Sequence, residues 1–140
     1  MGSVAPNMER FRAFLQEDSA GSEPLCMVNL LKFREQASYP EGFDAAPCSG
    51  REAYGRYMAE ARKCVAAVGG RLVWKAGVLA TVIAPDSETW DEVFIVEYPS
   101  RSAFARMVSD PGYQAIVPHR TAALADSRLI ASIADEELKG

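Results

Sequence analysis

Histidine and cysteine are scarce in this chain, and their scarcity limits the sites it can build. His119 is the single histidine among 140 residues, so no zinc site that needs two or more histidines can form within one chain. The three cysteines, Cys26, Cys48 and Cys64, are odd in number and form no Cys-x-x-Cys pair. We therefore predict no metal and no disulfide framework. Free thiols are typical of a reduced, cytoplasmic setting.

Long apolar runs and an excess of basic residues are also missing. No run approaches the roughly 20 apolar residues of a membrane span, and charges interrupt the amphipathic start at 1–14, unlike a signal peptide. Fifteen basic against nineteen acidic residues give a net charge of −4, whereas a nucleic-acid binder needs a basic face. There is no glycine-rich phosphate loop. We predict no membrane partner, no nucleic-acid partner and no cofactor.

The length and composition favour one domain at 1–140. Two domains would each be too small to bury a good core, and 49% hydrophobic with 24% charged residues is typical of a globular protein. An amphipathic helix capped by Asn7 and a polar link are predicted at 1–23. A core at 25–133 follows, and a long loop at 34–50 interrupts it.

Helix and strand signals alternate along this core. We predict strands at 25–33, 72–83, 93–98 and 128–133, and helices at 51–68, after Ser100, and from Asp110 to about residue 125 with a kink or restart at Pro118. The order strand, helix, strand, strand, helix, strand is the ferredoxin-like split βαβ arrangement. The predicted fold class is therefore α+β, a four-stranded antiparallel sheet with the helices on one face.

The predicted strands are apolar on both faces. In the first strand, Val28 and Leu30 point one way while Met27 and Leu31 point the other. The helices of one chain cover only one face, and an uncovered apolar sheet marks an interface. We predict a homodimer in which a second copy covers the other face with two-fold symmetry. The alternative is a monomer whose second face is covered by the N-terminal helix and the long loop.

Five segments together resemble a known family. They are MVNLLKFR at 27–34, AYGRYM at 53–58, GGRLVWKAG at 69–77, WDEVFIVEYPSRSAF at 90–104 and DPGYQAIVPHR at 110–120. From about residue 25 to residue 133 the chain is similar to the domain of unknown function thirteen-thirty, within the dimeric α+β barrel superfamily. The resemblance implies the fold and the dimer. It implies no particular reaction, because the superfamily includes cofactor-free oxygenases, haem enzymes and small-molecule isomerases.

Two polar residues in apolar strands are candidates for catalysis. The resemblance implies a cavity on the sheet face away from the helices, where the Asn29 amide could orient a ligand; alternatively, Asn29 bonds to neighbouring backbone. Glu97 ends the third strand. Partial burial there would favour its neutral form and suit proton transfer. Alternatively, Glu97 pairs with Lys32 or Arg34.

Ligand binding has a second set of candidates. Lys32, Arg34 and Arg120 could grip an anion, because guanidinium groups bind carboxylate or phosphate through two parallel hydrogen bonds. The resemblance implies a position for Arg120 near the open end of the pocket. Tyr57 and Trp74 could offer aromatic surface to the same pocket. The alternative is that the cations are ordinary surface residues and the aromatics belong to the core.

These residues support three functional hypotheses. The first is a homodimeric small-molecule-binding protein, with or without acid–base catalysis on a small organic anion, that uses Asn29, Glu97 and Arg120. The second is a cofactor-free or haem-dependent oxygenase that uses Asn29, a tryptophan and His119. The third is a dimeric binding module without catalysis. The sequence alone does not decide whether the protein is an enzyme.

Overall fold

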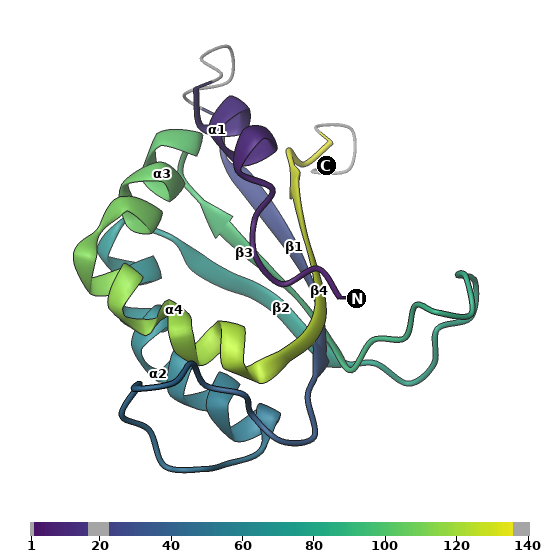
Figure 1. Ribbon diagram of the computed structural model, residues 1–140. Helices are drawn as coiled ribbons and strands as arrows, with labels where there is room; N and C mark the ends of the chain where they lie inside the picture. The colour runs from purple at the N-terminus through teal and green to yellow at the C-terminus, as the bar shows by residue number, and fades with distance from the viewer. Residues whose placement is uncertain (1, 17–22, 136–140) are drawn as a thin grey trace.

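Helices cover one side of a four-stranded sheet in the computed structural model, which describes residues 2–16 and 23–135 (Figure 1). The elements are α1 (Met8–Gln16), β1 (Leu25–Phe33), α2 (Gly50–Ala67), β2 (Arg71–Gly77), β3 (Glu92–Tyr98), α3 (Arg101–Ser109), α4 (Pro111–Ala123) and β4 (Leu124–Ser132). The strands pair in the order β2-β3-β1-β4, and every pairing is antiparallel. The predicted ferredoxin-like α+β fold is confirmed. Within the described residues, no helix is both long and apolar enough to cross a membrane.

The central strand β1 has the bounds that its sequence predicts. Successive side chains of a strand point to opposite faces, and the buried residues Leu25, Met27, Asn29 and Leu31 all point toward the helices. Their partners on β3 are the buried residues Phe94, Val96 and Tyr98, together with Glu92. This face of the sheet packs against α2 and α3 to form the core, and Leu31 and Leu124 are its largest fully buried side chains.

Side-chain caps fix where the helices begin. Asn7, Ser100 and Asp110 accept hydrogen bonds from the backbone N–H groups of Arg10, Ala103 and Gly112, as the sequence predicts. A kink or a restart was predicted at Pro118; helix α4 continues through Pro118 to Ala123, so it does not restart there. A proline inside a helix removes a single backbone donor, and here that loss does not end the helix.

Strand β2 is shorter than the sequence predicts. It ends at Gly77 rather than at residue 83, because Gly77 pairs with Glu92, the first residue of β3, and the apolar residues beyond it have no strand to pair with. Strand β4 is longer than predicted. It begins at Leu124, since Leu124 and Ser127 pair with Phe33 and Leu31 at the end of β1. Residues 78–89 therefore lie outside the sheet.

The long connection before α2 folds against the helices. An isolated bridge joins Gln36 to Ser49, and the Ser38 N–H donates to the Ala122 carbonyl at 2.9 Å. Farther along, the Tyr39 hydroxyl lies 2.7 Å from His119 Nδ1 and accepts a 3.2 Å hydrogen bond from Arg56 Nη1. We call residues 34–49 the helix-side loop, because these bonds hold the loop on α2 and α4.

The other face of the sheet has no helix on it in the part of the chain that the structure describes (Figure 1). We call this the open face. Its side chains include Trp74 and Ile130, each 51% exposed, next to half-buried neighbours of β1 and β3. The helix-side loop packs on α2 and α4, so it does not cover the open face. The open face is formed mainly by Val28, Leu30, Trp74, Val93, Ile95 and Ile130.

Candidate functional site

A cleft of about 1540 Å³ lies between the sheet and the helices. Strand residues that point toward the helices form its floor, among them Met27, Asn29 and Phe94. Helix α2 contributes Tyr54 and Tyr57 to one wall, and α1 with the segment before it lines another part. The pocket was predicted on the opposite face of the sheet. In the structure, the helices and the sheet of one chain enclose the cleft between them.

The charge of the cleft is of one sign. Its described lining contains no Asp, Glu, His or Lys, and its arginines are Arg10, Arg12, Arg62, Arg71, Arg120 and Arg128. Arg71 pairs with Glu97 at 3.2 Å, and Arg128 pairs with Asp126 at 2.7 Å and with Glu88 at 3.2 Å. Arg120 forms no ion pair with another described residue. The strand registers pair Arg71 with Glu97 and Arg128 with Leu30, so both of these side chains point to the other face of the sheet. The cations that remain in the lining are Arg10, Arg12, Arg62 and Arg120, although the whole chain carries a net charge of −4.

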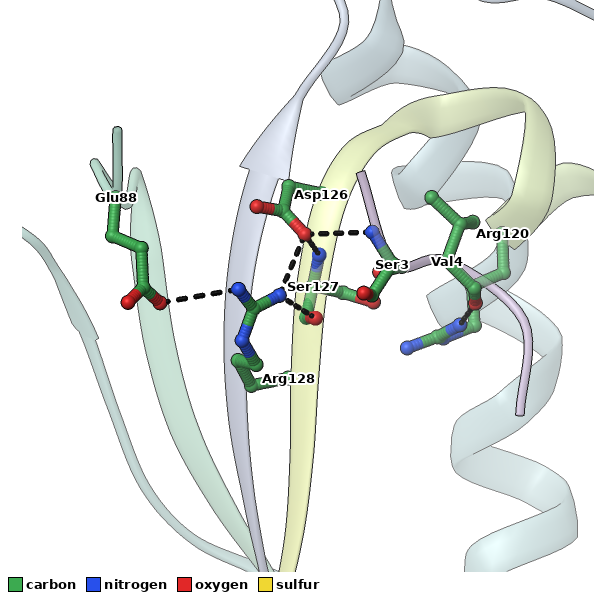
Figure 2. A network of polar contacts seen from close by, with 7 residues as sticks. All are labelled: Ser3, Val4, Glu88, Arg120, Asp126, Ser127 and Arg128. Carbon is green, nitrogen blue, oxygen red and sulfur yellow. Dashed lines mark hydrogen bonds and ion pairs between the residues drawn. The ribbon is translucent and has the colours of Figure 1, made fainter. Parts of the chain in front are cut away.

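Ser3 and Val4 line the cleft, and we call residues 2–4 the N-terminal strap. Ser127 Oγ donates to the Ser3 carbonyl at 2.6 Å, and the Ser3 N–H donates to Asp126 Oδ1 at 2.8 Å. Arg120 Nη1 donates to the Val4 carbonyl at 2.9 Å, as Figure 2 shows. The strap lies so close to β4 that a Cβ atom at Gly2 would be 1.7 Å from the Ala125 carbonyl oxygen.

Tyrosines surround the interior end of the Arg120 side chain. The hydroxyls of Tyr57 and Tyr113 lie 2.7 Å apart. Burial raises the pKa of Tyr54 above its usual range, and the Arg120 charge opposes part of that rise. Burial and the neighbouring Tyr113 raise the pKa of Tyr57 as well. At neutral pH Tyr54 and Tyr57 are uncharged, so their hydroxyls can donate and accept hydrogen bonds beside a fixed guanidinium charge.

Three of the predicted site residues line this cleft. Asn29 is 7% exposed, and its Nδ2 donates to the Met27 carbonyl at 3.2 Å, so part of its amide bonds to neighbouring backbone. Tyr57 is buried in the wall. Arg120 joins them from α4. The fold thus brings together Asn29, Tyr57 and Arg120, which are far apart in the sequence.

The other predicted residues lie elsewhere. Glu97 points to the open face and pairs with Arg71 rather than with Lys32 or Arg34. Lys32 donates to Thr89 Oγ1 at 2.9 Å. Arg34 is exposed at the end of β1, and Trp74 is half exposed on the open face. None of these four reaches the Arg120 region, since only Asn29, Tyr57 and Arg120 of the predicted set are in the cleft lining.

The residues expected of an oxygenase are also separated. His119 bonds to Tyr39 of the helix-side loop, and burial together with the Arg56 charge lowers its pKa below the usual range. Trp74 faces the opposite side of the sheet from Asn29. Trp90 lies under the Arg128 guanidinium, 5.0 Å from the ring centre. Within one chain, Asn29 therefore shares the cleft with neither a tryptophan nor the histidine.

Four residues around Arg120 were not predicted as site residues from the sequence. Ser127 and Tyr113 carried no visible signal, because their place in the cleft depends on the β1–β4 register and on the course of α4. Tyr54 is buried in the core of the protein, and it also lines the cleft. Val4 contributes only a backbone carbonyl, which no sequence pattern reveals. In residues 2–16 and 23–135, no cluster of three or more metal-ligating side chains is present.

Comparison with known proteins identifies the family. The family model described as "Domain of unknown function (DUF1330)" matches residues 47–133. The RPA0582 protein of Rhodopseudomonas palustris, described as a protein of unknown function, is 38% identical over 97% of this chain and 99% of its own, with a TM-score of 0.87. This chain belongs to the DUF1330 family. A crystal structure of methylated RPA0582 gives 39% identity over 96% of both chains, with the same TM-score.

More distant structures share only the fold with this DUF1330 protein. SnoaB of Streptomyces nogalater, a cofactor-independent oxygenase, is 16% identical over 84% of this chain and 99% of its own, with a TM-score of 0.53. A hydroxynitrile lyase of Passiflora edulis is 8% identical over 82% of this chain and 96% of its own, also with a TM-score of 0.53. No curated protein matches the sequence. One fold thus carries an oxygenase and a lyase, and the function of this chain has to be argued from its own cleft.

Proposed function

We propose that this DUF1330 protein binds a small organic anion in the cleft between its sheet and its helices. The observation that carries the proposal is an arginine-rich lining without a described acidic side chain, with Arg120 at the tyrosine cluster. An apolar pocket with a few convergent polar groups is the usual form of a small-molecule site. A guanidinium that lacks a carboxylate partner in such a pocket favours an anionic ligand.

The surroundings of Arg120 suggest how the ligand lies. Arg120 would bind the anionic group, and the hydroxyls of Tyr57 and Tyr113 would donate hydrogen bonds to, or accept them from, polar atoms next to it. The apolar part of the ligand would lie on Met27 and Phe94 of the floor. Partial exclusion of water strengthens the Arg–anion attraction relative to an open surface.

Binding is supported better than acid–base catalysis. Glu97, the predicted proton-transfer group, is held by Arg71 on the open face, and the described cleft lining supplies no other carboxylate and no imidazole. The phenols with raised pKa hold their protons at neutral pH and are therefore weak bases. Asn29 can orient a ligand but cannot transfer a proton at neutral pH.

A thermal-shift screen of organic acids against their neutral amides, followed by calorimetric titration of any hit, tests the proposal. Arg120→Ala should weaken binding by about 1.5–3 kcal/mol, the typical contribution of a hydrogen bond to a charged group. Arg120→Lys should retain only part of that binding energy, because lysine lacks the planar guanidinium that forms two parallel hydrogen bonds. Arg34→Ala removes an exposed arginine outside the cleft and should leave binding unchanged. An equal response to acids and amides, or a hit with full affinity for Arg120→Ala, would refute the anion site.

A second control separates the charge of Arg120 from its bond to the strap. Arg120→Ala removes both the guanidinium and the hydrogen bond to the Val4 carbonyl. Ser127→Ala removes a neighbouring strap bond but leaves the guanidinium in place. If the anion site is correct, Ser127→Ala should bind the acid much more tightly than Arg120→Ala. Equal losses in the two variants would mean that the position of the strap, rather than the charge, produces the affinity.

We also propose that the protein is a homodimer joined through its open face. The apolar side chains there, including the half-exposed Trp74 and Ile130, would otherwise remain in water. Ile130→Asp, on the edge strand β4, should weaken the dimer without removing a core side chain. Sedimentation equilibrium at micromolar concentration tests this. A single 15.2 kDa species for the unmodified protein would refute the dimer.

A further inference from the structure

Residues 78–89, which we call the arm, leave the sheet between β2 and β3 and project from the body of the molecule. Figure 1 shows the helices on one side of the sheet and the arm extending to the other side. The sequence of the arm begins like a strand, and it was predicted as one as far as residue 83. In the structure, however, it contains neither strand nor helix.

Three large apolar side chains of the arm lie almost wholly in solvent. Leu79 is 101% exposed, Val82 is 87% and Ile83 is 95%. The most exposed large apolar residue in the rest of the described chain is Met8, at 59%. Single exposed apolar residues are ordinary on protein surfaces. Three almost fully exposed apolar side chains within residues 79–83 of one projecting segment favour a contact with another molecule.

The base of the arm is fixed by bonds to the sheet. The Val78 N–H donates to the Asp91 carbonyl at 2.9 Å, and the Asp91 N–H donates to the Leu31 carbonyl at 2.8 Å. On the returning side, Lys32 Nζ donates to Thr89 Oγ1 at 2.9 Å and Arg128 pairs with Glu88 at 3.2 Å. The base therefore sets the direction in which the arm leaves, and a pre-organised segment loses less conformational entropy on binding than a free loop does.

We propose that the arm docks on a second copy of this chain and buries Leu79, Val82 and Ile83 against it. The arm and the open face lie on the same side of the sheet, so a body packed on the open face would stand next to the arm. Two-fold symmetry would make the contact mutual, with each arm reaching the partner. This inference rests on the proposed homodimer, and it adds an interaction surface that the sheet does not provide.

The test measures the dimer dissociation constant of arm variants by sedimentation velocity. Val82→Asp and Ile83→Asp should each raise it at least about tenfold, because a charge would enter an apolar contact in both copies. Ser87→Asp adds the same charge to an exposed turn position of the same arm and should change it less than about twofold. Because Val82 and Ile83 are solvent-exposed in one chain, the monomer fold should be unaffected, which circular dichroism checks.

The outcomes distinguish the two proposals. If Ile130→Asp weakens the dimer while Val82→Asp and Ile83→Asp match Ser87→Asp, the arm proposal is overturned and the sheet-face dimer stands. If the unmodified protein is a monomer throughout the micromolar range, the dimer proposal fails and the arm proposal fails with it. Weakening by Ile130→Asp and by both arm variants, with Ser87→Asp unchanged, supports both proposals. Weakening by the two arm variants while Ile130→Asp has no effect would refute the open-face dimer and, with it, the arm contact as proposed.

Discussion

Gly50 is buried where the helix-side loop meets α2, and its replacement tests how this loop returns to the sheet. A Cβ atom there would lie 2.1 Å from the Arg34 carbonyl oxygen and 2.6 Å from the Ala123 carbonyl oxygen. Both neighbours are backbone atoms, which cannot rotate aside as a side chain can. The Gly50 N–H donates to the same Arg34 carbonyl at 3.1 Å, and the Arg34 N–H donates to the Ala123 carbonyl at 2.8 Å.

The expected cost of Gly50→Ala follows from these contacts. Forcing one extra methyl group into a packed site typically costs about 1–3 kcal/mol. Displacing Arg34 would also strain its backbone hydrogen bond to Ala123, and a hydrogen bond contributes about 0.5–1.5 kcal/mol. The free energy of unfolding should therefore fall by about 1.5–4.5 kcal/mol in total. The overall stability of a domain is only about 5–15 kcal/mol, so this loss would be large.

Gly55→Ala is a matched control in the same helix. Gly55 is exposed on α2, and a Cβ atom there would meet nothing within 4 Å. Alanine at such a position should raise the free energy of unfolding by about 0.5–1 kcal/mol, because glycine is the poorer helix former. Urea unfolding of both variants followed by circular dichroism measures the difference. If Gly50→Ala were as stable as Gly55→Ala, the loop would not return to Arg34 and Ala123 as described.

Three further predictions concern a cap, the histidine and the strap. Ser49→Ala breaks the capping box in which Ser49 and Glu52 bond to each other's backbone N–H, and it should lower the urea-measured free energy of unfolding by about 1 kcal/mol. Burial and the Arg56 charge lower the pKa of His119 in the folded protein, so the imidazole binds a proton more readily in the unfolded chain. The free energy of unfolding should therefore fall as the pH drops through about 6.5 and below. His119→Gln should make this decrease smaller, as measured by urea unfolding at several pH values. Ser127→Ala should lower the free energy of unfolding by about 0.5–1.5 kcal/mol and should speed amide hydrogen exchange in the strap.

Each of these has an outcome that would contradict it. Full stability of Ser49→Ala would mean that the cap is not formed in solution. An unchanged pH slope for His119→Gln would assign the dependence to other groups. Ser132→Ala is the control for the strap, because its hydroxyl also donates from β4 to a backbone carbonyl, that of Cys26 at 2.7 Å. If Ser132→Ala speeds exchange in the strap as much as Ser127→Ala does, the Ser127 bond is not what holds it.

The fold could be predicted because each element carries its own local signal. The bounds of β1 were correct, since its nine residues are apolar on both faces and polar residues flank them. The caps Asn7, Ser100 and Asp110 were identifiable by residue type. The end of β2 could not be identified from the sequence, because the residues after Gly77 are still apolar and only the start of β3 decides where pairing stops.

The site was harder to predict, because it depends on which face each strand residue occupies. When a strand is apolar on both faces, its sequence does not show which residues point toward the helices. Asn29 and Glu97 were therefore predicted in one pocket. The register pairs Asn29 with Phe94 and Glu97 with Cys26, which puts the two polar residues on opposite faces. Arg120 was predicted in the pocket from the family resemblance, whereas its bond to Val4 joins residues 116 positions apart.

Two pairs of consecutive residues connect the helix-side loop to the cleft. On α2, Arg56 bonds to Tyr39 of the loop while Tyr57 lines the cleft; on α4, His119 bonds to Tyr39 while Arg120 lines the cleft. A substitution in the loop that rotates either helix would therefore move Tyr57 or Arg120 without changing any residue that a ligand touches. Differences in ligand preference between relatives of this protein can thus arise from a segment that never contacts the ligand.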